Sequence, residues 1–175
     1  MKMKIAVIGY SGAGKSTLAR KLGISYNCEV LHLDSVHFAS DWTERTDEEM
    51  TADVGLFMEK ENWIIDGNYS SILYKQRMEE ADRIVILNFN RFSCLRRAYK
   101  RYLMFKGNVR PDVADGCYEK FDREFVRWIL WEGRTEKARK RYRNTAASYP
   151  QKTIVLKNQA QLDRFLKKVN GDGSF

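Results

Sequence analysis

The sequence feature that most constrains the fold is a glycine-rich octapeptide near the start of the chain. Residues 9–16 read Gly-Tyr-Ser-Gly-Ala-Gly-Lys-Ser and match G-x-x-x-x-G-K-[ST] in full. An apolar run at 4–8 precedes this motif, and a helix-forming run at 17–22 follows it. In the order strand, loop, helix, the backbone N–H groups and the helix N-terminus face an anion. The motif therefore predicts a site for a nucleoside triphosphate.

The residues of this loop have separate expected roles. We expect Lys15 to bridge the β- and γ-phosphates and the Ser16 hydroxyl to bind Mg²⁺. The expected contacts to the triphosphate come from Gly9, Ser11, Gly12, Ala13, Gly14, Lys15, Ser16 and Thr17. The alternative is a glycine-rich turn that binds no ligand.

Length and composition narrow the class of protein. A chain of 175 residues fits one domain with a full core, and it has no apolar run near the ~20 residues that span a bilayer. The opening Met-Lys-Met-Lys leads directly into a predicted strand and does not have the pattern of a signal peptide. Three cysteines without zinc-site spacing indicate reduced thiols. We therefore expect a cytoplasmic protein with no membrane partner.

Five apolar, β-rich runs alternate with helical patterns. They lie at 3–8, 29–33, 62–66, 83–88 and 152–156. Thr46 and Glu49 form a predicted capping box at the start of one of the helices. Nearly all-apolar strands that alternate with helices indicate a parallel sheet with helices on both faces. We predict one α/β domain over residues 1–175, a P-loop NTPase three-layer sandwich with a five-stranded parallel sheet, whose ligands bind at the carboxyl ends of the strands.

One connection is longer than a crossover requires. Residues 89–151 separate the fourth and fifth predicted strands, where a single helix would suffice. Within it, residues 91–143 hold 16 Lys and Arg against 7 Asp and Glu, so this segment carries a net charge of 16 − 7 = +9. We expect a helical, basic lid at about 105–143 that closes over polyphosphate. The alternatives are a surface that contacts DNA and an arm for packing or dimerisation.

Two aspartates follow predicted strands and belong at the ligand-binding edge. Asp34 ends the second predicted strand, and Asp66 ends the third. Mg²⁺ keeps several waters and takes few protein ligands, and we expect Asp66 to hold it together with Ser16. Asp34 is better placed to orient an acceptor or to act as its general base. Either aspartate could instead only cap the next helix or turn, and His32, inside the strand, is predicted to be a core histidine.

The motifs together resemble a known family. The phosphate loop, Asp34, Asp66-Gly67 and the basic lid resemble the adenylate kinase group of P-loop kinases. More closely, the whole chain is similar to the bacterial DNA topology modulation (FlaR-related) proteins. The residues that carry this similarity are His32-Leu-Asp34, Trp63-Ile-Ile-Asp-Gly-Asn-Tyr69, Arg77 with Ala81-Asp82, Cys94-Leu-Arg96, Arg110-Pro-Asp112 and Gly116-Cys117. That family is named for an association with DNA supercoiling, whereas its sequence pattern is that of a kinase for nucleotides or small molecules.

The resemblance implies roles for the arginines of the lid. Arg110 resembles the first arginine of the adenylate kinase lid, and Arg123 and Arg127 resemble the later pair. The last two are four residues apart and share a helix face, so both are placed to reach the same phosphates. An ion pair with Glu119 is the rival explanation for Arg123.

One departure from the resemblance concerns the acceptor. Asn68-Tyr69 stands where adenylate kinases have Phe-Pro-Arg, so the arginine that grips a monophosphate is missing there. Arg77 or Arg45 could replace it, and the segment at about 35–61 is expected to form the acceptor pocket.

The expected function is transfer of the ATP γ-phosphoryl group to a nucleotide or another small acceptor, with Mg²⁺. The expected catalytic residues are Lys15, Asp34, Asp66, Arg110, Arg123 and Arg127. The alternatives are a DNA-linked NTPase and a nucleotide-binding regulator of DNA topology without kinase activity. The sequence contains no recognisable DNA-reading motif.

Overall fold

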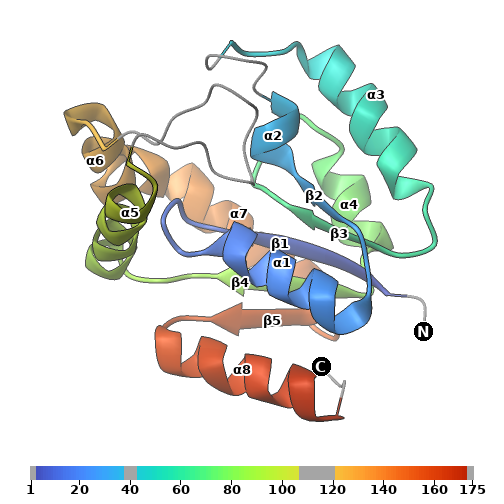
Figure 1. The fold of residues 1–175 in the computed structure, drawn as a ribbon. Helices are drawn as coiled ribbons and strands as arrows, with labels where there is room; N and C mark the ends of the chain where they lie inside the picture. Colours follow the sequence, from blue (N-terminus) through green and yellow to red (C-terminus); the bar gives the residue numbers. More distant parts are fainter. Residues whose placement is uncertain (1–2, 38–42, 107–120, 173–175) are drawn as a thin grey trace.

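A parallel five-stranded sheet organises the protein (Figure 1). The structure is a computed structural model, and it describes residues 3–37, 43–106 and 121–172. The strands have the spatial order β2-β3-β1-β4-β5, and every neighbouring pair is parallel. Their bounds are β1 Lys4–Gly9, β2 Val30–His32, β3 Trp63–Asp66, β4 Arg83–Leu87 and β5 Thr153–Leu156. The predicted fold class is confirmed, and each predicted strand is present with shifts of at most one residue at either end.

Helices cover both faces of the sheet (Figure 1). Helix α1 lies on the same face as α8, while α4 and α7 lie behind the sheet in the view of Figure 1. Their bounds, with those of the remaining helices, are α1 Lys15–Tyr26, α2 Leu33–His37, α3 Asp47–Met58, α4 Tyr74–Glu80, α5 Arg91–Phe105, α6 Arg123–Leu130, the 3₁₀ turn η2 Glu132–Arg134, α7 Glu136–Ser148 and α8 Gln159–Asp172. In the described part of the chain, no helix is both long and apolar enough to cross a bilayer.

The core lies along the central strand β1. Residues 5–8 of this strand are completely buried because β3 and β4 flank it and helices cover both faces. Burial on both faces explains why the strands read as apolar runs rather than as alternating patterns. The carboxyl ends of β1, β2 and β3 therefore meet at one edge of the sheet, where the phosphate loop begins.

Asp34 does not end a strand, and this prediction was wrong. Strand β2 stops at His32, and Asp34 lies in the first turn of the short helix α2. A carboxylate in the first turn faces the partial positive charge of the helix N-terminus, which favours this position. The apolar run at 29–33 did not reveal the change because Leu33 is fully buried in the helix as it would be in a strand.

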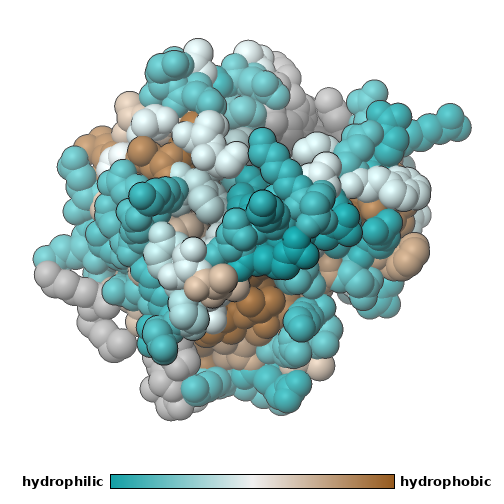
Figure 2. Space-filling model, turned by 180° about the vertical axis from the view of Figure 1, so that it is seen from behind, coloured by the Kyte–Doolittle hydropathy of each residue, from teal (hydrophilic) through white to brown (hydrophobic). Residues whose placement is uncertain are grey.

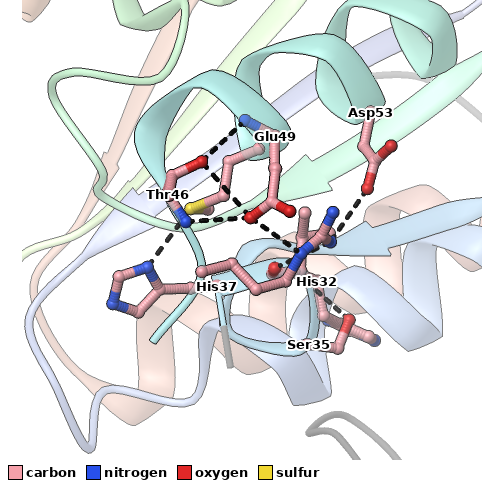
Figure 3. Close-up of polar contacts among 9 residues, drawn as sticks. His32, Ser35, His37, Thr46, Glu49 and Asp53 are labelled. Atoms are coloured by element: carbon pink, nitrogen blue, oxygen red, sulfur yellow. Dashed lines mark hydrogen bonds and ion pairs between the residues drawn. The ribbon is translucent and has the colours of Figure 1, made fainter. Parts of the chain in front are cut away.

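The predicted capping box at the start of α3 is confirmed (Figure 3). The Glu49 backbone N–H donates to the Thr46 hydroxyl at 3.2 Å, and the Thr46 N–H donates to the Glu49 carboxylate at 3.1 Å. This reciprocal pairing fixes where the helix begins. The expected acceptor segment (35–61) and lid (105–143) stay predictions, and residues 38–42 and 107–120 of them lie outside the described part.

A fully buried arginine holds the segment that follows β3. Arg77 donates to three backbone carbonyls, those of Ile72 at 3.0 Å, Gly67 at 3.2 Å and Tyr69 at 2.6 Å. Burial lowers the pKa of Arg77 to about 10, so the guanidinium stays charged at neutral pH. These bonds occupy the side chain and fix the curvature of residues 67–72. Arg77 is therefore a clamp for this segment and not a free group for an acceptor phosphate.

We expect Arg77→Met to lower the free energy of unfolding by about 2–4 kcal/mol, because three backbone carbonyls lose the charged donor of a fully buried side chain. Chemical denaturation followed by circular dichroism measures this change. Arg164→Met is the matched control on the exposed surface of α8 and should change stability by no more than about 0.5 kcal/mol. Equal stability of the two variants would contradict the role of Arg77 as a clamp.

Candidate functional site

The phosphate loop has the backbone that its glycines predict. Gly12 and Gly14 have φ of +77° and +93°, a region that side chains disfavour. A Cβ at Gly12 would lie 2.5 Å from the Cys94 carbonyl oxygen of α5, so the backbone of α5 leaves no room for a side chain. Helix α1 begins at Lys15, directly after Gly14. The loop thus places a helix N-terminus next to closely packed backbone, as a phosphate site requires.

Asn68 anchors the first residue of the loop, a contact that the sequence did not reveal. The Gly9 N–H donates to Asn68 Oδ1 at 3.0 Å, and Asn68 Nδ2 donates to the Gly9 carbonyl at 2.7 Å. Both backbone groups of Gly9 are therefore paired with one side-chain amide. The Gly67 N–H donates to the Val7 carbonyl at 3.1 Å just before this point, so Asn68 extends the pairing of β1 with β3 beyond the end of the strands.

Asp66 lies at the end of β3, as predicted, and its carboxylate contacts His32. The two residues are in register on neighbouring parallel strands, and Asp66 Oδ1 pairs with His32 Nδ1. Asp66 is almost fully buried. The prediction of His32 as a core histidine missed this contact, because strand register is needed to see it. The pairing orients the Asp66 carboxylate at the edge of the sheet that the phosphate loop shares.

Asp34 accepts a hydrogen bond from Tyr69. The hydroxyl of Tyr69 lies 3.0 Å from Asp34 Oδ1. Burial and the neighbouring Asp34 raise the pKa of Tyr69 far above its usual value, so the phenol stays protonated and donates. The ring of His37 packs on the ring of Tyr69 with centroids 4.7 Å apart. Asp34 is thus fixed through one oxygen next to a partly apolar wall.

The second arginine proposed to replace the missing acceptor arginine is also engaged. Arg45 Nη1 donates to the Val36 carbonyl at 3.1 Å and pairs with Asp53 at 2.9 Å. Figure 3 shows Asp53 on α3, on the side that faces these residues. Arg45 therefore ties α3 to the end of α2, so it fixes the wall of the expected acceptor segment.

Two further arginines, Arg134 and Arg97, pack against the phosphate loop. The sequence did not reveal these contacts, because they join segments that are far apart in the chain. Arg134 donates to the Phe89 carbonyl at 3.0 Å and contacts Cys94 Sγ at 3.1 Å. Its guanidinium carbon lies 3.8 Å from the centre of the Tyr10 ring, a cation–π contact inside the loop. Arg97 reaches over Gly14, where any side chain would collide with its guanidinium.

Two of the three lid arginines with expected catalytic roles, Arg123 and Arg127, lie on α6. Arg123 is exposed at the start of this helix, and Arg127 is exposed and pairs with Glu132. Helix α6 reaches the phosphate loop through Trp128, whose indole N–H donates to Ser11 Oγ at 3.2 Å. Arg110 and Glu119 lie outside the described residues. The catalytic roles of Arg110, Arg123 and Arg127 stay predictions.

A cavity of about 280 Å³, called here the inner cavity, opens next to the phosphate loop. Tyr10 and Ser11 of the loop, Asn68 after β3 and Arg141 of α7 are among its lining residues. The cavity thus lies between the loop, the segment after β3 and the α6–α7 region. Of the residues expected to bind the triphosphate, only Ser11 is among its lining residues.

Ser16 and Asp66 fit the chemistry of Mg²⁺. Both offer hard oxygen donors, and Mg²⁺ is bound by few protein groups beside phosphates and water. In the described ranges, no three His, Cys, Asp or Glu side chains gather in a metal-ligating cluster. The donor set agrees with a cation held mainly by substrate, and the assignment of Ser16 and Asp66 stays a prediction.

Comparison with known proteins identifies the fold. No family model matches the chain. The chain is 27% identical over 159 residues to a gluconokinase from Arabidopsis thaliana, covering 91% of this chain and 75% of that protein. A shikimate kinase from Acinetobacter baumannii in complex with shikimate superimposes with a TM-score of 0.51 at 16% identity, over 95% of this chain and 90% of that one. A deoxyadenosine kinase from M. mycoides superimposes with a TM-score of 0.51 at 14% identity, over 96% of this chain and 99% of that one.

The fold is that of the P-loop kinases. The more specific resemblance to DNA topology modulation proteins stays a prediction.

We expect Asn68→Asp to weaken binding of Mg²⁺-ATP by roughly 5–30-fold, about 1–2 kcal/mol. The carboxylate can still accept from the Gly9 N–H, but it cannot donate to the Gly9 carbonyl, and it adds negative charge beside the phosphate loop. Isothermal titration calorimetry measures the dissociation constant.

Asn62→Asp is the matched control for this change. Asn62 Oδ1 only accepts, from the Met3 N–H at 2.8 Å, at the opposite end of β1 from the phosphate loop. This variant should bind ATP as the parent protein does. An unchanged affinity of Asn68→Asp would show that the anchor of Gly9 does not affect the phosphate site.

Proposed function

We propose that this protein is a small-molecule kinase that transfers the ATP γ-phosphoryl group to a hydroxyl group of its acceptor. The observation that carries the proposal is the arrangement at one edge of the sheet. A complete phosphate loop follows β1, Asp66 ends β3, and Asp34 lies just beyond β2 with a hydrogen bond from Tyr69. The P-loop kinase fold and the relation to a gluconokinase support the same conclusion.

The engaged arginines favour a hydroxyl acceptor over a nucleoside monophosphate. A monophosphate would require a free arginine near the acceptor, but Arg77 is bonded to three carbonyls and Arg45 to Val36 and Asp53. A hydroxyl acceptor instead requires a base, and Asp34 supplies a carboxylate. The name of the gluconokinase gives gluconate as acceptor, a polyhydroxylated acid, and compounds of this class are the first to test.

In the proposed reaction, the acceptor oxygen forms a bond to the γ-phosphorus while the bond to the β,γ-bridging oxygen breaks. ADP leaves with the bonding electron pair, and the hydroxyl proton passes to Asp34. Lys15 holds the β- and γ-oxygens, while Arg110, Arg123 and Arg127 are placed by the proposal over the charge of the transferring group. A well-placed arginine of this kind contributes roughly 10³–10⁵ in rate. Mg²⁺, held by Ser16 and Asp66, would neutralise phosphate charge when bound.

The test is an ATP-consumption screen with Mg²⁺ against pooled polyhydroxylated acids, sugars, nucleosides and nucleotides, with Lys15→Ala as the blank. We expect one pool to stimulate ATP consumption and to yield a phosphorylated product, and Lys15→Ala to lose both. ATP bound but never transferred would contradict the proposal and favour a nucleotide-binding regulator. Identification of the product by mass spectrometry names the acceptor.

With the acceptor known, we expect Asp34→Asn to lower kcat by roughly 10²–10⁴-fold, because the amide cannot take the hydroxyl proton. The affinity for ATP should stay within about twofold, since Asp34 lies on the acceptor side. Steady-state kinetics and calorimetry separate the two effects. An Asp34→Asn variant that keeps the parent kcat would remove Asp34 from the mechanism.

A further inference from the structure

A second and larger cavity lies beside the inner cavity along α7, and the two share Lys137 and Arg141 as lining residues. It has a volume of about 390 Å³ and lies between α4 and α7; we call it the outer cavity. Figure 2 views the molecule from the side that these two helices cover, and hydrophilic residues dominate the centre of that face. The volume is in the range of ~300–1,000 Å³ that small-ligand sites occupy. Nothing in the proposed kinase reaction uses this cavity.

The outer cavity is lined by four cations. Lys75 comes from α4, and Lys137, Lys140 and Arg141 come from α7. Lys140 and Arg141 follow Lys137 by three and four residues, so the three side chains lie on one face of the helix. Among the described residues that line the cavity, none is Asp or Glu. The lining therefore carries a charge of about +4 that no carboxylate within the cavity balances.

Partners outside the cavity neutralise little of this charge. Lys75 is 85% exposed and pairs with Glu79 at 3.5 Å, a surface pair of the kind that contributes little. Within the described part of the chain, no carboxylate pairs with Lys137 or Lys140. Like charges at this spacing repel one another, which costs stability unless an anion lies between them.

Arg141 and the tyrosines give the cavity a defined shape. The Arg141 guanidinium lies 5.8 Å from the Tyr74 ring centre, and Arg141 Nη1 donates to the Asn68 carbonyl at 3.3 Å. Arg141 Nε is buried without a hydrogen-bond partner. The hydroxyl of Tyr74 pairs with Thr145 at 2.9 Å, and burial raises the pKa of Tyr74, so this ring stays neutral. Tyr74 and Tyr149 add aromatic walls beside the cations.

We propose that the outer cavity is a binding site for a phosphorylated small molecule, distinct from the ATP and acceptor sites. A phosphate group carries up to two negative charges and matches a lining of several cations better than a single carboxylate does. The volume and the tyrosine rings fit a compact ligand, a free nucleotide or a sugar phosphate.

The lining residues make a selective test possible. Lys137 and Arg141 line both cavities, whereas Lys75 and Lys140 line only the outer one. The variant Lys75→Glu/Lys140→Glu therefore changes the outer cavity without touching the phosphate loop. Lys167→Glu/Lys168→Glu makes the same charge change at two exposed positions of α8, on the opposite face of the sheet, and is the matched control.

The experiment is isothermal titration calorimetry on the full chain with its phosphate loop saturated by Mg²⁺ and a non-hydrolysable ATP analogue. Pyrophosphate, AMP and glucose 6-phosphate are the three probes. We expect at least one probe to bind to the parent protein. The Lys75→Glu/Lys140→Glu variant should bind this probe about tenfold more weakly or worse, equivalent to ~1.4 kcal/mol. The α8 control should bind it as the parent does. AMP as the tightest probe would assign a nucleotide, and glucose 6-phosphate a sugar phosphate.

Three outcomes would overturn the proposal. The first is that no probe binds. The second is that the Lys75→Glu/Lys140→Glu variant and the α8 control lose affinity for the probe equally. The third is that a DNA duplex binds but no small probe does, which would make this face a polyanion surface. Ser148→Trp, which places a bulky ring at the lining without changing charge, is a second variant in case the charge reversals unfold the chain, and it should also weaken binding. Parent and variants keep the phosphate loop, so failure here leaves the ATP-consumption screen unaffected.

Discussion

The end of β1 is held by hydrogen bonds on both sides, and the rest of the site depends on this. On one side, the Asn68 amide pairs with both backbone groups of Gly9. On the other side, the Tyr10 N–H donates to the Leu87 carbonyl at 3.3 Å. The phosphate loop therefore starts from a fixed point between β3 and β4. Because Arg77 in turn fixes the segment that contains Asn68, a buried cation far from the motif supports the geometry of the loop.

The sequence predicted the features that depend on local patterns. The strand–loop–helix order, the five strands and the capping box at Thr46 each follow from neighbouring residues, and all are present. Asp66 was placed correctly because it is the last residue of an apolar strand. Asp34 was assigned to a strand end because a buried Leu33 looks the same in a strand and in the first turn of a helix.

The contacts that sequence reasoning missed depend on register and packing. His32 meets Asp66 only because β2 and β3 pair with these residues side by side. Arg77 was considered as a replacement for the missing acceptor arginine, and Arg134 was not singled out, but both donate to backbone carbonyls. The basic segment was expected to act as one lid over polyphosphate, whereas its described cations have different partners. Arg134 faces the loop, and Arg127 pairs with Glu132. Three of the cations of α7 line the outer cavity, and the other two pair with Glu136.

Helix α7 is a wall that two cavities share, and Arg141 contributes to both. Its guanidinium also donates to the carbonyl of Asn68, the residue that anchors Gly9. A ligand in one cavity that changes the rotamer of Arg141 also changes the lining of the other cavity, and so the affinity of that cavity for its own ligand. Thermodynamic linkage then makes the effect mutual: the factor by which one occupant alters the affinity for the second equals the factor in the reverse direction. Two neighbouring cavities would in this way respond to each other's occupancy through the rotamer of one shared side chain.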